Sequence, residues 1–359
     1  MDLLATTWMT RSLEEPVASV AIENDGSVVA GGWNGALKRW DPKGELLWKT
    51  VLNDRVNDLM FHGNHLIATA GLHLVCVDLV SGTTQWSHPL EGSADAALIH
   101  EGIVYATSSV YDIEHNDFIE SAVWSYELDG TERWVTRMDE RPWTIESCDG
   151  KVWLGLGRPK CGFATIDSKG ALHHHKGPVD SPITSGSTHQ SNLIFGHADG
   201  TVSDRSAVLL HSLNDGIVSL CAHQMGCLAA DEAGHLHSFS PTGESHWCLK
   251  GDAVEAHSIG FEVEGKPTCW IARRSGVTGH LQVVDTTDGT QLAASESIDV
   301  RFLSFAAGRM VAGCENGDVH VWETGLFTRR FTSKSEGQNP ASDPKKNALQ
   351  EKLRKLRER

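Results

Sequence analysis

The sequence predicts an all-β protein, a single β-propeller of about eight four-stranded blades followed by a short C-terminal α-helix. Three observations predict this fold class. A pattern of short apolar runs and turns recurs with a period of roughly 35 to 45 residues. Glycine and tryptophan occur 35 and 12 times, against three tyrosines. Segments such as LHLVCVDL and DVHVWE alternate apolar and polar residues, which is typical of strands.

The repeated unit is clearest in residues 17–50 and 55–90. Each contains an apolar run, a turn, a second apolar run, another turn, an alternating segment and a closing tryptophan. Four short strands per unit are typical of a propeller blade. Because one later unit is degenerate, seven blades remain an alternative to eight. The later units span residues 94–138, 143–176, 182–213 (the degenerate one), 217–249, 254–295 and 300–331.

The place of each strand within a blade follows from its residues. First strands such as VASVAI and ADAALI contain small residues, which fits the crowded wall of a central channel. The alternating third strands fit positions packed between neighbouring blades. Residues 3–9 could add a strand to the last blade, but that unit already has four predicted strands. The sequence therefore leaves ring closure open.

One motif carries a resemblance to known propellers. Residues 78–86, DLVSGTTQW, resemble the quinoprotein (PQQ-like) repeat, in which an aspartate, a Thr/Ser-Gly pair and a tryptophan dock one blade onto the next. Trp40-Asp41 and Trp322-Glu323 resemble the end of a WD repeat. The chain is therefore similar to the quinoprotein-like and WD-repeat propellers over residues 15–331. The resemblance implies blade-docking roles for Trp48, Trp86, Trp134 and Trp247.

We predict no cofactor, no metal site and no catalytic residue. Quinoprotein dehydrogenases carry a calcium site and two adjacent cysteines beside PQQ, and no two of the eight cysteines here are adjacent. The histidines at 173–175 cannot all face one ion from a strand, because successive side chains point to opposite faces. His175 aligns instead with the docking tryptophans. His235 and His237 share a strand face, but no Cys or carboxylate ligand is visible at matched spacing.

The third unit carries an insertion between its second and third strands, at residues 111–120. This hairpin opens on the same face as the connections between blades, a face that propellers commonly use for ligands. Acids interleaved with aromatic and branched residues suit a contact loop, and a tolerated surface elaboration is the alternative. The candidate contact residues are Tyr111, Asp112, Glu114, Asp117, Phe118 and Glu120.

The connections into the first strands repeatedly carry an acid. If the blades close as predicted, these acids surround one mouth of the central channel and attract cations or basic partners. Turn formation by aspartate is the alternative reason for their positions, and Arg55, Arg141 and Arg301 dilute the ring. The candidate interaction residues are Asp54, Asp180, Asp215, Asp252 and Asp299.

The C-terminal end differs from the rest of the chain. We expect the propeller in residues 1–332, a linker in residues 333–343 and a basic amphipathic helix in residues 344–359. This tail holds seven Lys or Arg and two Glu, so it contributes +5 to the total of −16 and leaves −21 for the rest. Its candidate contact residues are Lys345, Lys346, Leu349, Lys352, Leu353, Arg354, Lys355, Leu356, Arg357 and Arg359.

The tail can dock on a partner or on another copy of the chain, and an unstructured solubilising end is the alternative. We do not expect nucleic acid or membranes as partners. An acidic body repels phosphate backbones, and three leucines bury too little to anchor a membrane.

These features favour a non-catalytic scaffold that binds protein partners, basic ones included, through an acidic loop face. The alternative is a propeller enzyme with an active site at the channel mouth. A broad face with exposed aromatics would indicate the scaffold, and a funnel of converging His, Arg and carboxylates would indicate the enzyme. The first residues carry Asp2 and no sustained apolar run, so we expect no secretory signal and a cytoplasmic protein.

Overall fold

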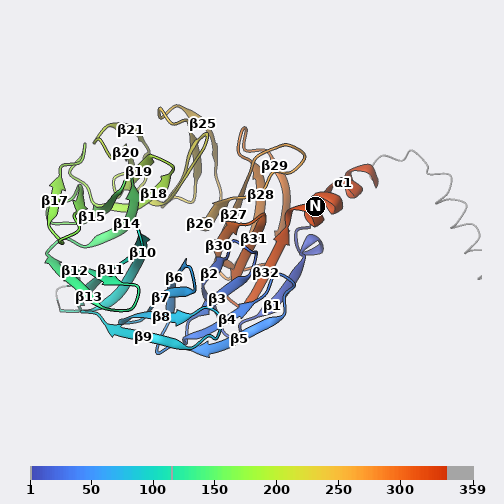
Figure 1. Ribbon diagram of the computed structural model, residues 1–359. Coiled ribbons are helices and arrows are strands. Elements are labelled where there is room, and N and C mark those ends of the chain that lie inside the picture. Colours follow the sequence, from blue (N-terminus) through green and yellow to red (C-terminus); the bar gives the residue numbers. More distant parts are fainter. Residues whose placement is uncertain (1, 115, 338–359) are drawn as a thin grey trace, which may run out of the picture.

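Eight sheets form a ring in the computed structural model, which describes residues 2–114 and 116–337, with side chains described as far as residue 332 (Figure 1). Within these residues each sheet has four antiparallel strands, and one C-terminal helix follows the last of them. The all-β propeller class and the count of eight blades are confirmed. The degenerate unit at 182–213 forms a complete blade, so the seven-bladed alternative is wrong.

In blades 1 to 7 the four strands follow one another in the sequence from the channel outward. Blade 1 is β2 (Val17–Ile22), β3 (Val28–Gly32), β4 (Ala36–Trp40) and β5 (Leu46–Val51). Blade 2 is β6 (Val56–His62), β7 (His65–Ala70), β8 (His73–Asp78) and β9 (Thr84–Pro89). Blade 3 is β10 (Ser93–His100), β11 (Ile103–Asp112), β12 (Asp117–Glu127) and β13 (Glu132–Met138). Blade 4 is β14 (Pro142–Cys148), β15 (Lys151–Leu156), β16 (Phe163–Ile166) and β17 (Leu172–His175).

The same order continues through the second half of the ring. Blade 5 is β18 (Ile183–His189), β19 (Asn192–His197), β20 (Thr201–Asp204) and β21 (Leu209–Ser212). Blade 6 is β22 (Ile217–His223), β23 (Gly226–Asp231), β24 (Leu236–Phe239) and β25 (Ser245–Leu249). Blade 7 is β26 (Ala253–Ile259), β27 (Thr268–Ser275), β28 (Thr278–Asp285) and β29 (Gln291–Glu296). Blade 8 takes β30 (Val300–Ala306), β31 (Arg309–Cys314) and β32 (Asp318–Glu323) from this end of the chain.

The N-terminus supplies the outer strand of blade 8. After the short 3-10 helix η1 (Leu4–Thr6), β1 (Met9–Ser12) pairs antiparallel with β32, with Met9 opposite Val321 and Ser12 opposite Asp318. β30 also lies against β2, so the innermost strands close the ring. The expected fourth strand of the last unit is therefore wrong, and the first and last segments of the fold share one sheet.

Residues 324–331 form a helix instead of that strand. α1 (Thr324–Gly337) begins where the carboxylate of Glu323 accepts the backbone N–H groups of Gly325 and Leu326, at 3.0 and 2.8 Å. These bonds satisfy donors that the first helical turn leaves free. The expected linker at 333–343 is wrong in its first part, because α1 continues to Gly337. Residues 338–343 and the expected helix at 344–359 lie outside the described residues.

The apolar core is divided among the junctions between blades. At the junction of blades 7 and 8, Phe327 of α1 packs into a buried cluster with Trp270 and Trp322. At the junction of blades 8 and 1, Val311 packs with Val17. Each blade thus buries its two faces against its neighbours, which explains why the third strands are apolar.

The four candidate docking tryptophans all bridge to the next blade. Each indole N–H donates to a backbone carbonyl there: Trp48 to Leu79 at 2.8 Å, Trp86 to Leu128 at 2.9 Å, Trp134 to Ser168 at 3.0 Å and Trp247 to Thr286 at 2.8 Å. Trp48 and Trp247 are buried, whereas Trp86 and Trp134 are half-buried. In blade 4 the matching position opposite the third strand is occupied by His173 and not by His175 as expected.

Candidate functional site

One face of the ring gathers most of the candidate residues. We define the loop face as the connections between blades, the turns that join the second and third strands of each blade, and the strand ends that adjoin these segments. The connections are residues 13–16, 52–55, 90–92, 139–141, 176–182, 213–216, 250–252 and 297–299. The turns are residues 33–35, 71–72, 113–114 with 116, 157–162, 198–200, 232–235, 276–277 and 315–317.

A ring of β-bulges shapes the channel mouth on this face. The first strand of every described blade shifts register near its start, which leaves one unpaired residue there. A bulge re-aims the side chain of the extra residue, so these positions set the chemistry of the mouth. They hold a mixture of side chains and not a ring of acids: Ala18, Asn57, Asp95, Trp143, Thr184, Val218, Glu255 and Arg301.

The predicted acids on the loop face fall into two groups. Asp54, Asp180 and Asp252 are exposed, and Asp215 is half-buried. Asp299, in contrast, lies 3.6 Å from Arg274 and 3.8 Å from Arg301. Burial raises the pKa of Asp299, and the charges of Glu315 and Glu255 raise it further.

Arginines neutralise part of the expected acidic mouth. Arg301 pairs with Glu255 at 2.7 Å and with Glu315 at 2.9 Å, and Arg141 pairs with Asp95 at 3.2 Å. The negative potential of the loop face therefore comes from the exposed acids of the connections rather than from the mouth itself.

The predicted insertion at 111–120 is an extension of the β11–β12 hairpin. Tyr111 pairs opposite Phe118, and their rings meet edge to face at 5.1 Å. The Tyr111 hydroxyl donates to the Asn116 side-chain oxygen at 2.6 Å. Asp112, Glu114, Asp117 and Glu120 follow around the hairpin end, where Ile113 is 86% exposed. The hairpin thus presents aromatic and acidic side chains beyond the level of the other turns.

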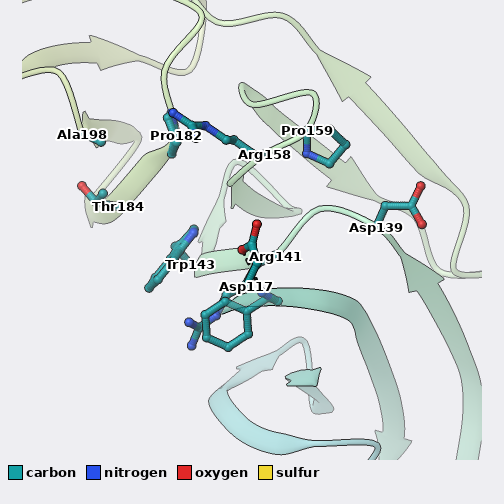
Figure 2. Close-up of a pocket in the computed structure, with 10 residues that line it drawn as sticks. Asp117, Asp139, Arg141, Trp143, Arg158, Pro159, Pro182, Thr184 and Ala198 are labelled. Carbon is teal, nitrogen blue, oxygen red and sulfur yellow. Dashed lines mark hydrogen bonds between the residues drawn. The ribbon is translucent and has the colours of Figure 1, made fainter. Parts of the chain in front are cut away.

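A pocket opens between this hairpin and blades 4 and 5 (Figure 2). The guanidinium carbon of Arg141 lies 3.7 Å from the ring centre of Phe118 and 4.0 Å from that of Trp143. The pocket has a volume of about 400 Å³ and is also lined by Asp117, Asp139, Arg158, Pro159, Pro182, Thr184 and Ala198. Arg141 is held by two aromatic rings and Asp95, whereas the exposed Arg158 has no ion pair within the described part of the chain.

Large aromatic side chains are exposed next to this pocket and beyond it. Trp33, Tyr111 and Trp143 are 45%, 46% and 44% exposed, and all three lie on the loop face of blades 1, 3 and 4. On blade 2, the apolar side chain of Leu72 is also exposed on the loop face. The guanidinium of Arg55 stacks on Trp33 at 3.8 Å. Sequence reasoning singled out neither Trp33 nor Trp143, because their exposure depends on their positions at a turn and a bulge.

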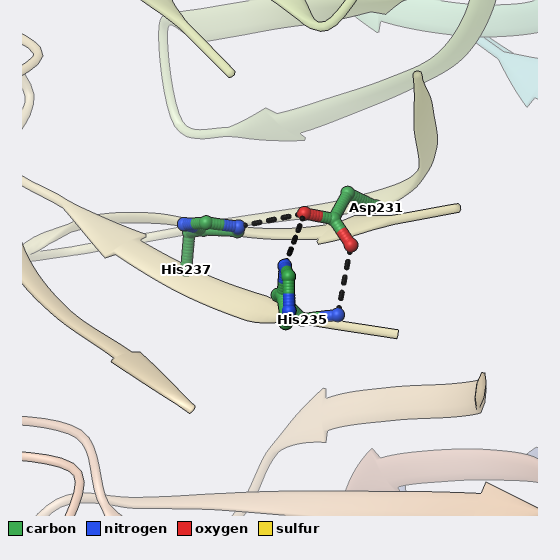
Figure 3. Close-up of side chains that lie close together, drawn as sticks. All are labelled: Asp231, His235 and His237. Carbon is green, nitrogen blue, oxygen red and sulfur yellow. Dashed lines mark hydrogen bonds and ion pairs between the residues drawn. The ribbon is translucent and has the colours of Figure 1, made fainter. Parts of the chain in front are cut away.

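A second cluster lies at the turn between β23 and β24 (Figure 3). Asp231 brings a carboxylate to His235 and His237, with its Oδ2 atom 3.2 Å from His235 Nδ1 and 2.9 Å from His237 Nε2. Burial raises the pKa of Asp231, but hydrogen bonds from both histidines and their charges outweigh it, so the pKa is lowered overall. The sequence prediction missed this carboxylate, which precedes the two histidines by four and six residues.

The other run of histidines is dispersed. His173 lies 3.8 Å from Asp167, and the His174 ring bonds to the Cys161 carbonyl at 2.8 Å. His175 stacks on Phe163 at 5.5 Å. The tail residues from Lys345 to Arg359 lie outside the described residues. No helix in the described part of the chain is long and apolar enough to cross a membrane.

The comparisons with known proteins show a similarity of fold. The sequence matches no protein-family profile. It also matches no curated protein. Sqt1 of Saccharomyces cerevisiae has a similar structure, with a TM-score of 0.71 and 10% identity over 89% of this chain and 98% of Sqt1. BamB from Moraxella catarrhalis gives 0.69 and 15% over 88% of this chain and 99% of BamB.

A third similar structure is BBS1N, solved in complex with ARL6DN. It has a TM-score of 0.55 and 12% identity over 88% of this chain and 95% of BBS1N. At these identities the likeness concerns the fold alone. The resemblance of this chain to quinoprotein-like and WD-repeat propellers is confirmed at that level.

Proposed function

We propose that this chain is a non-catalytic scaffold that binds a protein partner on the loop face of blades 1 to 4. The observation that carries the proposal is the exposure of Trp33, Tyr111 and Trp143 on that one face. Tryptophan, tyrosine and arginine dominate the residues that contribute most to protein–protein binding. One structure of similar fold, BBS1N, was solved in complex with ARL6DN.

Stacking favours binding at this place because it restricts the side chains before a partner arrives. Arg55 is stacked on Trp33, and Arg141 is stacked on Phe118 and Trp143. Side chains that are already ordered lose less conformational entropy on association. The pocket beside Trp143 is large enough to receive a side chain or a short peptide segment from the partner.

The charge of the loop face favours a basic partner. Asp54 and Asp139 lie in the connections, and Glu114, Asp117 and Glu120 lie on the β11–β12 hairpin. Asp117 and Asp139 line the pocket together with Trp143. Exposed acids of this kind accelerate encounter with a basic surface, and added salt weakens the effect. Asp95 and Asp299 contribute less because arginines pair with them.

The enzymatic alternative has weaker support. At the channel mouth Arg301 pairs with Glu255 and Glu315, so these charged groups satisfy one another. An active site needs groups that converge on a position where a substrate can lie. We also place the protein in the cytoplasm, because its eight cysteines are free thiols and most are buried, as is usual in reducing compartments.

The experiment compares affinity capture by three forms of the full-length chain. The double variant Trp33→Ala/Trp143→Ala removes two exposed aromatics. The matched control Leu46→Ala/Val80→Ala removes two exposed apolar side chains away from the loop face. The proposal is supported if wild type and the control retain a partner that the double variant binds at least about 10-fold more weakly. A partner that binds all three forms equally would place the interaction elsewhere.

A further inference from the structure

The turn between β23 and β24 carries a cluster with the chemistry of a metal site. We propose that Asp231, His235 and His237 bind one divalent transition-metal ion of the zinc class. This inference is independent of the proposed interaction with a protein. It reverses the expectation from the sequence, because the fold supplies the carboxylate that the spacing did not reveal.

The donor atoms are close to the geometry that such an ion requires. Asp231 Oδ2 lies 2.9 Å from His237 Nε2 and 3.2 Å from His235 Nδ1, and all three donor atoms lie within 4.8 Å of one another. Two ligands that are each about 2.0–2.2 Å from a tetrahedral ion lie about 3.3–3.6 Å apart. Small side-chain rotations therefore suffice to exchange the shared hydrogen bonds for metal bonds.

The hairpin fixes the carboxylate in the orientation that a ligand needs. The backbone N–H of His235 donates to Asp231 Oδ1 at 2.8 Å, which leaves Oδ2 for the imidazoles. The backbone N–H of Asp231 donates to the His235 carbonyl at 3.0 Å, and Gly234 takes a φ of +84° between them. Hydrogen bonds behind a ligand orient it and raise metal affinity.

The imidazoles differ in exposure in a way that suits binding. The His237 ring is stacked on the buried Phe239 at 5.9 Å, so packing holds its orientation. Asp231 is buried, whereas His235 lies at the solvent edge with 27% of its side chain exposed. An ion can therefore enter from the loop face past His235. Three protein ligands leave a tetrahedral ion one further position, for water or for a group from a partner.

The neighbouring blade shows that the fold does not need this set of residues. The strand register of blade 5 places His197, Thr201 and Ser203 where blade 6 has Asp231, His235 and His237. There a hydrogen bond joins His197 Nε2 and Ser203 Oγ at 2.8 Å, and His197 Nδ1 bonds to the Ser181 carbonyl at 3.3 Å. Blade 6 instead uses a carboxylate and two imidazoles, which are ligands that zinc-class ions favour.

One nearby cation opposes binding. Arg273 packs behind the turn and lowers the local negative potential, but its guanidinium is engaged by the carbonyls of Gly234, Asp252 and Leu249. It therefore does not pair directly with Asp231. The carboxylate remains available, and its charge offsets part of the charge of a bound ion.

The test uses tag-free, full-length protein that has been stripped of metal with a chelator. We expect Co²⁺ to bind at one equivalent and to give the visible absorption of a tetrahedral site, and Zn²⁺ to displace it. His235→Gln and His237→Gln should each weaken Co²⁺ binding at least about 10-fold to 100-fold. His173→Gln is the matched control, because it removes an exposed histidine that also faces a single aspartate.

A second measurement guards against variants that fold poorly. Zn²⁺ at about 10 times the Kd of wild type should raise the Tm of wild type and His173→Gln, and it should raise the Tm of His235→Gln much less. His235 is partly exposed, so this variant should fold. Absence of stoichiometric Co²⁺ binding by wild type would overturn the proposal. So would equal binding by wild type and by the double variant His235→Gln/His237→Gln.

Discussion

At the scale of the residue, the repeat motif has a direct physical cause. Gly82 follows Asp78 in the turn of blade 2, with a φ of +73°. A Cβ atom at Gly82 would lie 2.7 Å from the indole of Trp48, the tryptophan that blade 1 inserts against this turn. The glycine of one blade and the tryptophan of the preceding blade are therefore a matched pair. This contact is why both residue types are so frequent in the sequence.

The contact predicts how two glycine substitutions differ. Gly63→Ala changes a residue with a φ of +57° and open space around its Cβ position, so it should cost about 1–2 kcal/mol for backbone strain. Gly82→Ala adds a clash with Trp48 and should cost about 1–3 kcal/mol more. Urea unfolding of the two variants measures the difference. If both variants lose the same free energy of unfolding, Trp48 moves aside without cost and the pair does not set the blade spacing.

Residues that depend on local spacing could be predicted from the sequence, and residues that depend on a turn could not. The four docking tryptophans follow from the repeat. Asp231 lies close to His235 and His237 because a tight turn folds the chain back between them. Trp143 is directed to the channel mouth by a bulge, and a bulge has no simple sequence pattern. In the sequence, Asp231 is followed three residues later by Gly234 and then by His235. This spacing was the available signal for the cluster.

At the scale of the element, ring closure depends on contacts between the two ends of the chain. β1 pairs with β32, and Arg330 of α1 donates to the carbonyls of Ala5 and Thr7, at 3.2 Å each. Such pairings join segments more than 300 residues apart, so no local pattern encodes them. The repeat predicted a fourth strand within the last unit. The capping by Glu323 and the burial of Phe327 favour the helix instead.

The junction between β22 and β26 predicts a dependence of stability on pH. His257 is half-buried there, and its Nε2 atom bonds to Ser219 Oγ at 2.9 Å. Burial lowers its pKa to about 4; the bond to Ser219 opposes this shift and the charge of Arg273 adds to it. Its Nδ1 atom has no hydrogen-bond partner in the described part of the chain, so a proton there would lack an acceptor.

The sign of the effect follows from the lowered pKa. Below about pH 6.5 the unfolded chain binds a proton at His257, and the folded protein does not until about pH 4. The stabilisation is therefore complete above pH 6.5 and is lost as the pH falls toward 4, by up to about 1.4 kcal/mol per pH unit. Between pH 7 and pH 5, His257→Gln should lose less unfolding free energy than wild type, and exposed His173→Gln should match wild type. Parallel pH profiles for all three would show that His257 does not carry the effect.

At the scale of the whole molecule, the two faces of the ring have different roles. The exposed aromatics and the acidic connections lie on the loop face. The third strands run away from that face, so α1, which follows β32 directly, begins on the opposite side of blade 8. The basic segment at 344–359 continues from this helix in the sequence. The channel mouth of the same chain lies on the other face of the ring and is therefore a distant target for this segment. The loop face of a second copy or of a partner is the more accessible acidic surface.

This geometry sharpens the prediction for the tail. If residues 344–359 dock on the loop face of another copy, the chain should self-associate weakly at low salt and dissociate at high salt, because exposed ion pairs contribute about 0–1 kcal/mol each and are screened. Deletion of residues 344–359 should abolish this association, and light scattering across a salt series measures it. Substitution of Asp54, Asp180 and Asp252 by Asn should weaken it in the full-length chain, since these exposed acids would supply the complementary charge. If the deletion changes partner capture but not self-association, the tail serves an external protein. If it changes neither at any salt concentration, the tail is a solubilising end.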